Sequence, residues 1–169
     1  MIDELARQGG RPDLVICSVG GGGLLCGVVE GLRRNGWADV PVIAAETAGA
    51  DSYAQALRAG APVLLPEITS IATSLGARQV CGRALELAQE HPIESVVVSD
   101  AAAVAACEDV LLEHRILVEP ACGVSVAALD SDSEFLRNAR SVAVILCGGV
   151  GVTAAQLAQW RAQFAAQSL

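Results

Sequence analysis

The 169-residue sequence contains no lysine, so all eleven of its basic side chains are arginine guanidinium groups. No side chain can therefore supply a primary amine, either to hold a phosphate or to attack a carbonyl carbon. This absence also excludes the phosphate-binding signature GxxxxGK[ST], which ends in a lysine and a hydroxyl residue. Any phosphate that these residues bind must be held by other donors.

Other features that would indicate particular partners are missing as well. The net charge of -8 argues against nucleic acid or an anionic membrane as a partner. No apolar run reaches the roughly 18 residues of a membrane span, and the acidic start predicts no secretory signal. The cysteines form no C-x-x-C pair, which disfavours a zinc cluster and fits reduced thiols in a cytoplasmic protein. They are Cys17, Cys26, Cys81, Cys107, Cys122 and Cys147.

What the sequence does contain is a regular alternation of apolar runs and amphipathic stretches. This pattern, with 53% hydrophobic residues, is typical of a folded α/β protein. We expect strands at residues 13–19, 40–46, 95–98 and 141–146. We expect helices at residues 2–9, 24–35, 51–58, 81–89, 101–113, 120–129 and 153–166. The prediction is a single domain, residues 1–169, with a doubly wound parallel sheet, helices on both faces, and ligands at the carboxyl ends of the strands.

Four consecutive glycines, Gly20, Gly21, Gly22 and Gly23, join the first expected strand to the helix after it. Glycine has no Cβ, so it allows close approach of a ligand to the backbone and tolerates positive φ. The backbone N–H groups and the positive end of the helix dipole would face the same point. The arrangement therefore predicts a phosphate cradle rather than a flexible linker, because linkers are rarely flanked tightly by a strand and a helix.

A nicotinamide dinucleotide is one candidate ligand whose phosphate the loop could bind. Glu46 ends the second expected strand, downstream of the glycines, as a ribose-binding acid does in dinucleotide-binding domains. The spacing G-x-G-x-x-G fails, however, because its third glycine falls on Leu25 or Cys26. The dinucleotide is therefore the weaker alternative.

Four motifs occur in order along most of the chain. They are Ser-Val-Gly-Gly-Gly-Gly-Leu-Leu (residues 18–25), Thr-Ala-Gly-Ala after Glu46 (47–50), Val-Glu-Pro-Ala-Cys-Gly (118–123) and Leu-Cys-Gly-Gly (146–149). Ile-Thr-Ser-Ile-Ala (68–72) and Glu-His-Pro-Ile (90–93) extend the likeness, which runs from near residue 12 to about residue 165. In this order and spacing, the sequence resembles the serine dehydratase and serine-threonine deaminase group of fold-type II pyridoxal-phosphate enzymes.

The resemblance implies pyridoxal 5′-phosphate as cofactor and a small amino acid as substrate. The four glycines and the amide of Leu24 would match the loop that cradles the cofactor phosphate. Cys147 would match the residue beside the pyridine nitrogen, where a neutral thiol suits β-elimination better than transamination. From the residues alone, Cys147 can also be a small buried apolar side chain at a strand end.

The resemblance also implies a monovalent, potassium-like cation near the phosphate loop. The matching ligands would be the side chains of Glu46 and Ser52 and the carbonyl groups of Gly20, Ala50, Leu75 and Ala77. A carboxylate combined with several carbonyl oxygens suits a hard cation. On the residues alone, Glu46 can instead be a solvated acid and Ser52 a plain helix cap.

Three departures from the family pattern bear on activity. The family's catalytic lysine in a Ser-x-Lys context, its small domain and the loop that grips the substrate carboxylate have no match here. Val150 and Gly151 stand where polar residues are usual in the family. We therefore expect this chain to be the C-terminal part of an L-serine/L-threonine dehydratase (ammonia-lyase) and to be inactive alone. The parent enzyme would make pyruvate or 2-oxobutanoate, together with ammonia. The alternative is a non-catalytic domain that binds the cofactor or a partner, as a homodimer or with a full-length paralogue.

Overall fold

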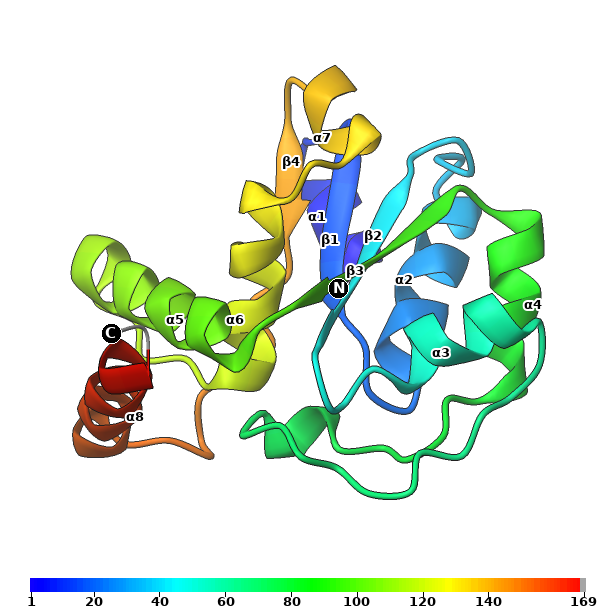
Figure 1. Cartoon of the computed structure of the whole chain (residues 1–169). Coiled ribbons are helices and arrows are strands. Elements are labelled where there is room, and N and C mark those ends of the chain that lie inside the picture. The colour runs from blue at the N-terminus through cyan, green and yellow to red at the C-terminus, as the bar shows by residue number, and fades with distance from the viewer. Residues whose placement is uncertain (168–169) are drawn as a thin grey trace.

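The computed structural model describes residues 1–167, and within them a single parallel sheet lies at the centre (Figure 1). Its strands are β1 (Leu14–Ser18), β2 (Val42–Thr47), β3 (Ile93–Val98) and β4 (Val142–Val144), in the order β3-β2-β1-β4. Ile16 of β1 lies opposite Ile43 of β2 and Val144 of β4. Because all four strands are parallel, their carboxyl ends meet at one edge, where the expected ligand loops begin.

Helices cover both faces of the sheet, as the sequence pattern predicted (Figure 1). One face carries α1 (Ile2–Gln8), α2 (Gly23–Arg34), α3 (Ser52–Ala59) and α4 (Gly82–Glu90). The other carries α5 (Asp100–His114), α6 (Pro120–Ala127) and α7 (Glu134–Asn138), with α8 (Ala154–Gln167) packed on α5 and single turns η1 (Thr73–Leu75) and η2 (Ala128–Asp130). No helix within residues 1–167 is long and apolar enough to cross a membrane.

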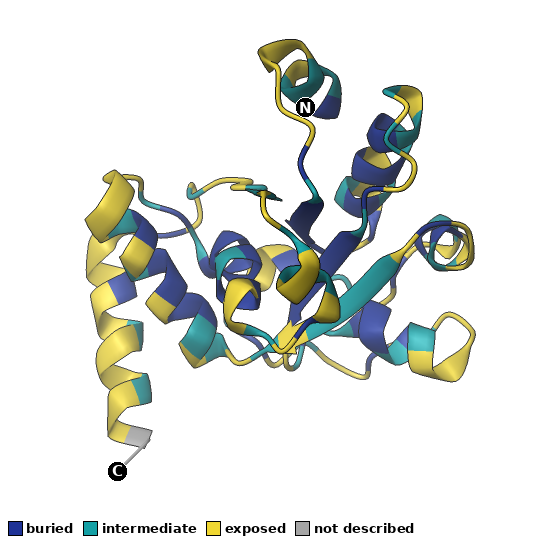
Figure 2. Ribbon diagram, turned by 90° about the horizontal axis from the view of Figure 1, so that it is seen from above, coloured by how far each residue is buried: buried dark blue, intermediate teal, exposed yellow. Residues whose placement is uncertain are grey.

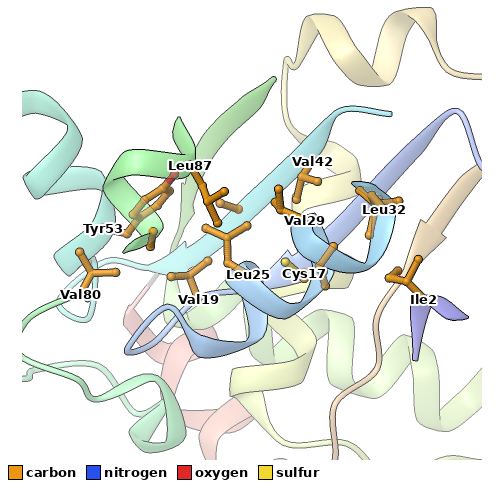
Figure 3. Close-up of a cluster of buried hydrophobic side chains, with 14 of the residues drawn as sticks. Ile2, Cys17, Val19, Leu25, Val29, Leu32, Val42, Tyr53, Val80 and Leu87 are labelled. Carbon is orange, nitrogen blue, oxygen red and sulfur yellow. The ribbon is translucent and has the colours of Figure 1, made fainter. Parts of the chain in front are cut away.

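Side chains along β1 alternate between two hydrophobic cores, one on each face of the sheet. Val15 and Cys17 point into the cluster beneath α2, whereas Leu14 and Ile16 point into the cluster beneath α6. Figure 3 shows the first cluster, in which Leu25 and other residues of α2 meet the sheet. The burial of β1 on both faces explains why its sequence is a continuous apolar run. Figure 2 shows the contrast with α8, whose outer surface is exposed.

Most expected elements are confirmed, and the differences have local causes. The expected last strand, residues 141–146, is shorter in the structure, and Ile145 continues the pairing with one hydrogen bond to the Ile16 carbonyl. The sequence analysis assigned no element to residues 135–140, whereas the structure has the short helix α7, which Ser133 caps by accepting the Leu136 N–H. Its Phe135 packs against the core beneath α6. A serine cap and a partly buried phenylalanine therefore accompany this short helix.

Candidate functional site

A cavity of about 240 Å³ lies at the carboxyl edge of the sheet, between the first strand and the segments that follow β3 and β4. Its lining includes all four consecutive glycines together with Leu24 and Cys147. The full lining is Ser18, Gly20, Gly21, Gly22, Gly23, Leu24, Ser74, Leu75, Glu119, Ala121 and Cys147. The structure thus brings every residue that the sequence analysis assigned to the cofactor into one cavity. Complete small-molecule pockets start at about 300 Å³, so this cavity is large enough for part of a ligand.

Gly22 is the position in the loop where glycine is required. It precedes α2 as the N-cap with φ 91, in the left-handed region. A Cβ there would lie 2.9 Å from Ala84 Cβ and 3.0 Å from Cys81 Sγ. The Cys81 N–H also donates to the Gly21 carbonyl at 3.0 Å. The back of the loop is therefore packed against the start of α4, which leaves its other side to line the cavity.

Gly20 is enclosed for a different reason. A Cβ at Gly20 would come within 3.3 Å of Leu75 Cα and 3.4 Å of its carbonyl oxygen. The turn η1 therefore lies directly against the entry to the loop, and it also contributes Ser74 to the cavity lining. No neighbour lies within 4 Å of a Cβ built on Gly23, so the loop opens outward at the start of α2.

The start of α2 is suited to an anion. The first N–H groups of a helix have no partner within the helix, and the helix dipole adds partial positive charge there. The first turn of α2 contains no acidic side chain, and the cavity lining contains no basic one. Glu119, an acid in the lining, accepts the Gly151 N–H at 3.0 Å. Backbone donors are therefore the groups that would meet a phosphate, and the cradle fits one.

Cys147 lines the same cavity and is solvent-exposed, so the alternative of a buried apolar cysteine is wrong. Its Sγ is 3.7 Å from Ser18 Oγ, and its thiol donates to the Ala121 carbonyl at 3.9 Å. Hydrogen bonding from the Cys122 thiol, and then from the Ser18 hydroxyl, lowers the pKa of Cys147. The sequence analysis expected a neutral thiol here, and the hydrogen bond to the Ala121 carbonyl is one that a protonated sulfur makes.

Glu46 is fully buried, so the alternative of a solvated acid is also wrong. Its two carboxylate oxygens accept the N–H groups of Tyr53 and Ala54, each at 2.8 Å. Glu46 therefore caps α3, a role that the sequence analysis considered for Ser52. Burial raises the pKa of Glu46 to about 7, against the lowering effect of these two hydrogen bonds.

The remaining residues of the expected cation site lie close by. Ser52 is buried, and its Oγ has no hydrogen-bond partner among residues 1–167. Ala50 and Leu75 share one buried cluster, and Leu75 touches Gly20 as described above. Ala77 lies beside the loop as well, with its Cβ 3.8 Å from a Cβ built on Gly21. An unpartnered buried hydroxyl is a group that an oxygen-binding cation would satisfy, whereas the Glu46 oxygens already accept N–H groups.

Four residues of the cavity lining were not assigned as individual site residues: Ser18, Ser74, Glu119 and Ala121. Ser18, next to Cys147, is the last residue of β1, and the rule that ligands lie beyond the carboxyl ends of strands could have identified it. Ser74 lies in the turn η1, more than 50 residues from the glycines, and no spacing in the sequence indicated it. Within residues 1–167, no three His, Cys, Asp or Glu side chains cluster as metal ligands.

Residues 1–148 match the protein family described as pyridoxal-phosphate dependent enzyme, which covers most of the chain and the whole glycine loop. The chain belongs to the pyridoxal-phosphate dependent enzyme family. This membership agrees with the donor set of the cavity, in which a helix start can hold the phosphate and a cysteine can meet the ring.

Named relatives narrow the comparison within the pyridoxal-phosphate family. Over 155 residues the chain is 50% identical to the human L-serine dehydratase/L-threonine deaminase, covering 87% of this chain and 47% of that protein. It superposes on a fungal L-serine ammonia-lyase from Rhizomucor miehei with a TM-score of 0.91, at 35% identity, covering 96% of this chain and 54% of the other. Superposition on maize serine racemase gives a TM-score of 0.81 at 28% identity, covering 96% of this chain and 51% of the racemase. The chain thus spans about half the length of the relatives it matches.

Proposed function

We propose that the cavity holds the phosphate end of pyridoxal 5′-phosphate. Gly20, Gly21, Gly22 and Gly23, with the amide of Leu24, would surround the phosphate, and Cys147 would meet the pyridine nitrogen. The observation that carries the proposal is the first turn of α2, whose N–H groups line a cavity without basic side chains. Family membership and the failed G-x-G-x-x-G spacing favour this cofactor over a nicotinamide dinucleotide.

The reaction we propose for the protein to which this domain contributes is the release of ammonia from L-serine or L-threonine. The products would be pyruvate or 2-oxobutanoate, in keeping with the names of the human and fungal relatives. When bound, the cofactor supplies a conjugated ring that accepts the electron pair released at the α-carbon of the amino acid. The residues of this chain would fix the phosphate and orient the ring, and Glu119, held by Gly151, would border the same space.

Proton removal from the α-carbon must come from a group outside these 169 residues. The resemblance assigns that step to a lysine, and none is present here. We therefore propose that residues 1–169 form one α/β domain of the cofactor-binding half, to be completed by a segment that carries the amine. The six free thiols favour a cytoplasmic location for such a protein.

A second candidate function follows from the same absence. Without an amine, the domain can still bind the cofactor or a partner, either as a homodimer or with a full-length paralogue. A regulatory role of this kind needs no catalytic lysine. Ammonia release by a purified complex with such a paralogue, set against the paralogue alone, distinguishes the two functions.

The cofactor proposal predicts that the phosphate group supplies most of the affinity. Calorimetric titration of the purified chain with pyridoxal phosphate should give a dissociation constant at least about tenfold lower than titration with pyridoxal, because charge-assisted hydrogen bonds contribute about 1.5–3 kcal/mol each. Inorganic phosphate should compete with the cofactor. Equal affinities for pyridoxal phosphate and pyridoxal would contradict a phosphate-binding role for the loop. Tighter binding of a nicotinamide dinucleotide would favour the dinucleotide as the ligand.

The second part of the proposal is a monovalent, potassium-like cation held by Glu46, Ser52 and the carbonyl groups of Gly20, Ala50, Leu75 and Ala77. Potassium chloride should then raise Tm by about 2–5 °C relative to tetramethylammonium chloride at equal ionic strength. Glu46→Gln should abolish the difference, because the amide carries no charge. Glu67→Gln, which removes an exposed carboxylate, is the matched control and should keep it. A potassium effect that survives Glu46→Gln would contradict this site.

A further inference from the structure

Two cysteines meet directly behind the glycine loop, outside the cavity. Cys26 lies in the first turns of α2, and Cys81 is the N-cap residue of α4. Their Sγ atoms are 3.9 Å apart, although the residues are 55 positions apart in the sequence. A disulfide bond is about 2.05 Å long, so the sulfur atoms need to approach by roughly 1.8 Å. Cys81 is exposed and lies at the helix boundary.

The surroundings give the two thiols different reactivities. Cys81 is exposed, whereas Cys26 is only partly accessible. Burial, followed by the proximity of Cys81, raises the pKa of Cys26 and keeps its thiol protonated, and the Arg83 guanidinium acts in the opposite direction. An external disulfide therefore reaches Cys81 first. Cys26, already in contact with Cys81, is in position to complete the exchange.

We propose that Cys26 and Cys81 form a reversible intramolecular disulfide that ties the start of α2 to the start of α4 behind the phosphate loop. The oxidant is a low-molecular-weight disulfide such as oxidised glutathione. The Cys81 thiolate attacks one sulfur of that disulfide, and one glutathione leaves as the thiol. Cys26 then loses its proton and attacks Cys81 Sγ, the second glutathione leaves as the thiol, and the protein pair has lost two protons and two electrons.

The link would act on the loop because the loop already depends on this contact. The Cys81 N–H donates to the Gly21 carbonyl at 3.0 Å, and the Cys26 N–H donates to the Gly22 carbonyl at 2.9 Å. A covalent bond between the two side chains would hold both donors in place. We expect slower hydrogen exchange at residues 21–24 and a rise in Tm of about 5–10 °C in the oxidised chain, since the link closes a long loop in the unfolded state.

Peptide mapping tests the proposal on the full chain. Trypsin cleaves after Arg78 and Arg83, so it releases Cys81 in the peptide 79–83 and Cys26 in the peptide 8–33. After treatment with oxidised glutathione and non-reducing digestion, the two peptides should appear linked, with a mass two hydrogens below their sum. Dithiothreitol should separate them.

Three variants make the outcome specific. In Cys26→Ala the disulfide link should be lost and Cys81 should retain glutathione. Loss of the link would also show that Cys17, in the same tryptic peptide, does not replace Cys26 as the partner of Cys81. Cys81→Ala should lose the link and carry no glutathione in this region. Cys147→Ala, which changes the other exposed thiol, should form the link normally. Stable glutathionylation of Cys81 in the unaltered chain, or a linked chain with unchanged Tm and hydrogen exchange, would overturn the proposal.

Discussion

Gly22→Ala is expected to lower the free energy of unfolding by about 2–4 kcal/mol and to abolish measurable binding of pyridoxal phosphate. The new Cβ would lie about 3 Å from Ala84, Cys81 and Val80, at a backbone φ of 91. Overpacking costs about 1–3 kcal/mol, and the left-handed conformation costs a non-glycine residue about 1 kcal/mol more. Relief would require the start of α4 to move away, which breaks its hydrogen bond to Gly21. Urea unfolding and cofactor titration measure the two effects.

Gly27→Ala is the matched control, because it makes the same substitution within α2. A Cβ on Gly27 has open space, and the residue lies inside the helix. Alanine should therefore stabilise the chain by about 0.5–1 kcal/mol and leave cofactor binding unchanged. Equal effects of the two substitutions, in either direction, would show that the tight packing behind Gly22 does not govern the loop.

Purified chain comprising residues 1–169 should release no pyruvate from L-serine above the rate of free cofactor, a loss of many orders of magnitude against an intact lyase. The physical reason is that no side chain offers an amine, and the amino group of Met1 is paired with Glu4 at 3.0 Å. The bound cofactor should also stay noncovalent: dialysis should remove it, and borohydride reduction should leave the mass of the chain unchanged. A coupled assay for pyruvate, with the fungal lyase as positive control, measures the rate.

One result would contradict the predicted inactivity of the chain. Pyruvate formation that follows the chain through successive purification steps, and that disappears when cofactor is withheld, would show that another residue replaces the lysine. In that case Cys147 and Glu119, the ionisable side chains in the cavity lining, become the groups to substitute first. Without such activity, the domain remains a cofactor-binding half-site.

The sheet and the phosphate loop were predictable because their signals are local. The apolar run of β1, the four glycines and the amphipathic α2 are contiguous, and each feature constrains the next. Parallel topology then places the ends of β1 and β4 at one edge, so the proximity of Cys147 to the glycine loop follows from chain order. The family motifs indicated which cofactor carries the phosphate, a question that the spacing of the glycines alone left open.

The features that sequence could not predict depend on contacts between distant segments. An acid at a strand end is usually solvated, and nothing near Glu46 signals that α3 folds back so that its N–H groups reach the carboxylate. The contact of Cys26 with Cys81 likewise depends on how α4 packs on α2. Cys147 lies in the cavity, but its contacts with Ser18 and the Ala121 carbonyl come from two other elements.

The central claim is that the backbone N–H groups of the glycine loop hold the cofactor phosphate. Amide nitrogen–proton NMR spectra of the ¹⁵N-labelled chain, recorded during titration with pyridoxal phosphate, test it most directly. The account predicts the largest shifts at the amides of Gly21, Gly22, Gly23 and Leu24, with much smaller shifts when pyridoxal replaces the phosphorylated compound. Shifts that leave these four amides unchanged and centre on another surface would contradict it.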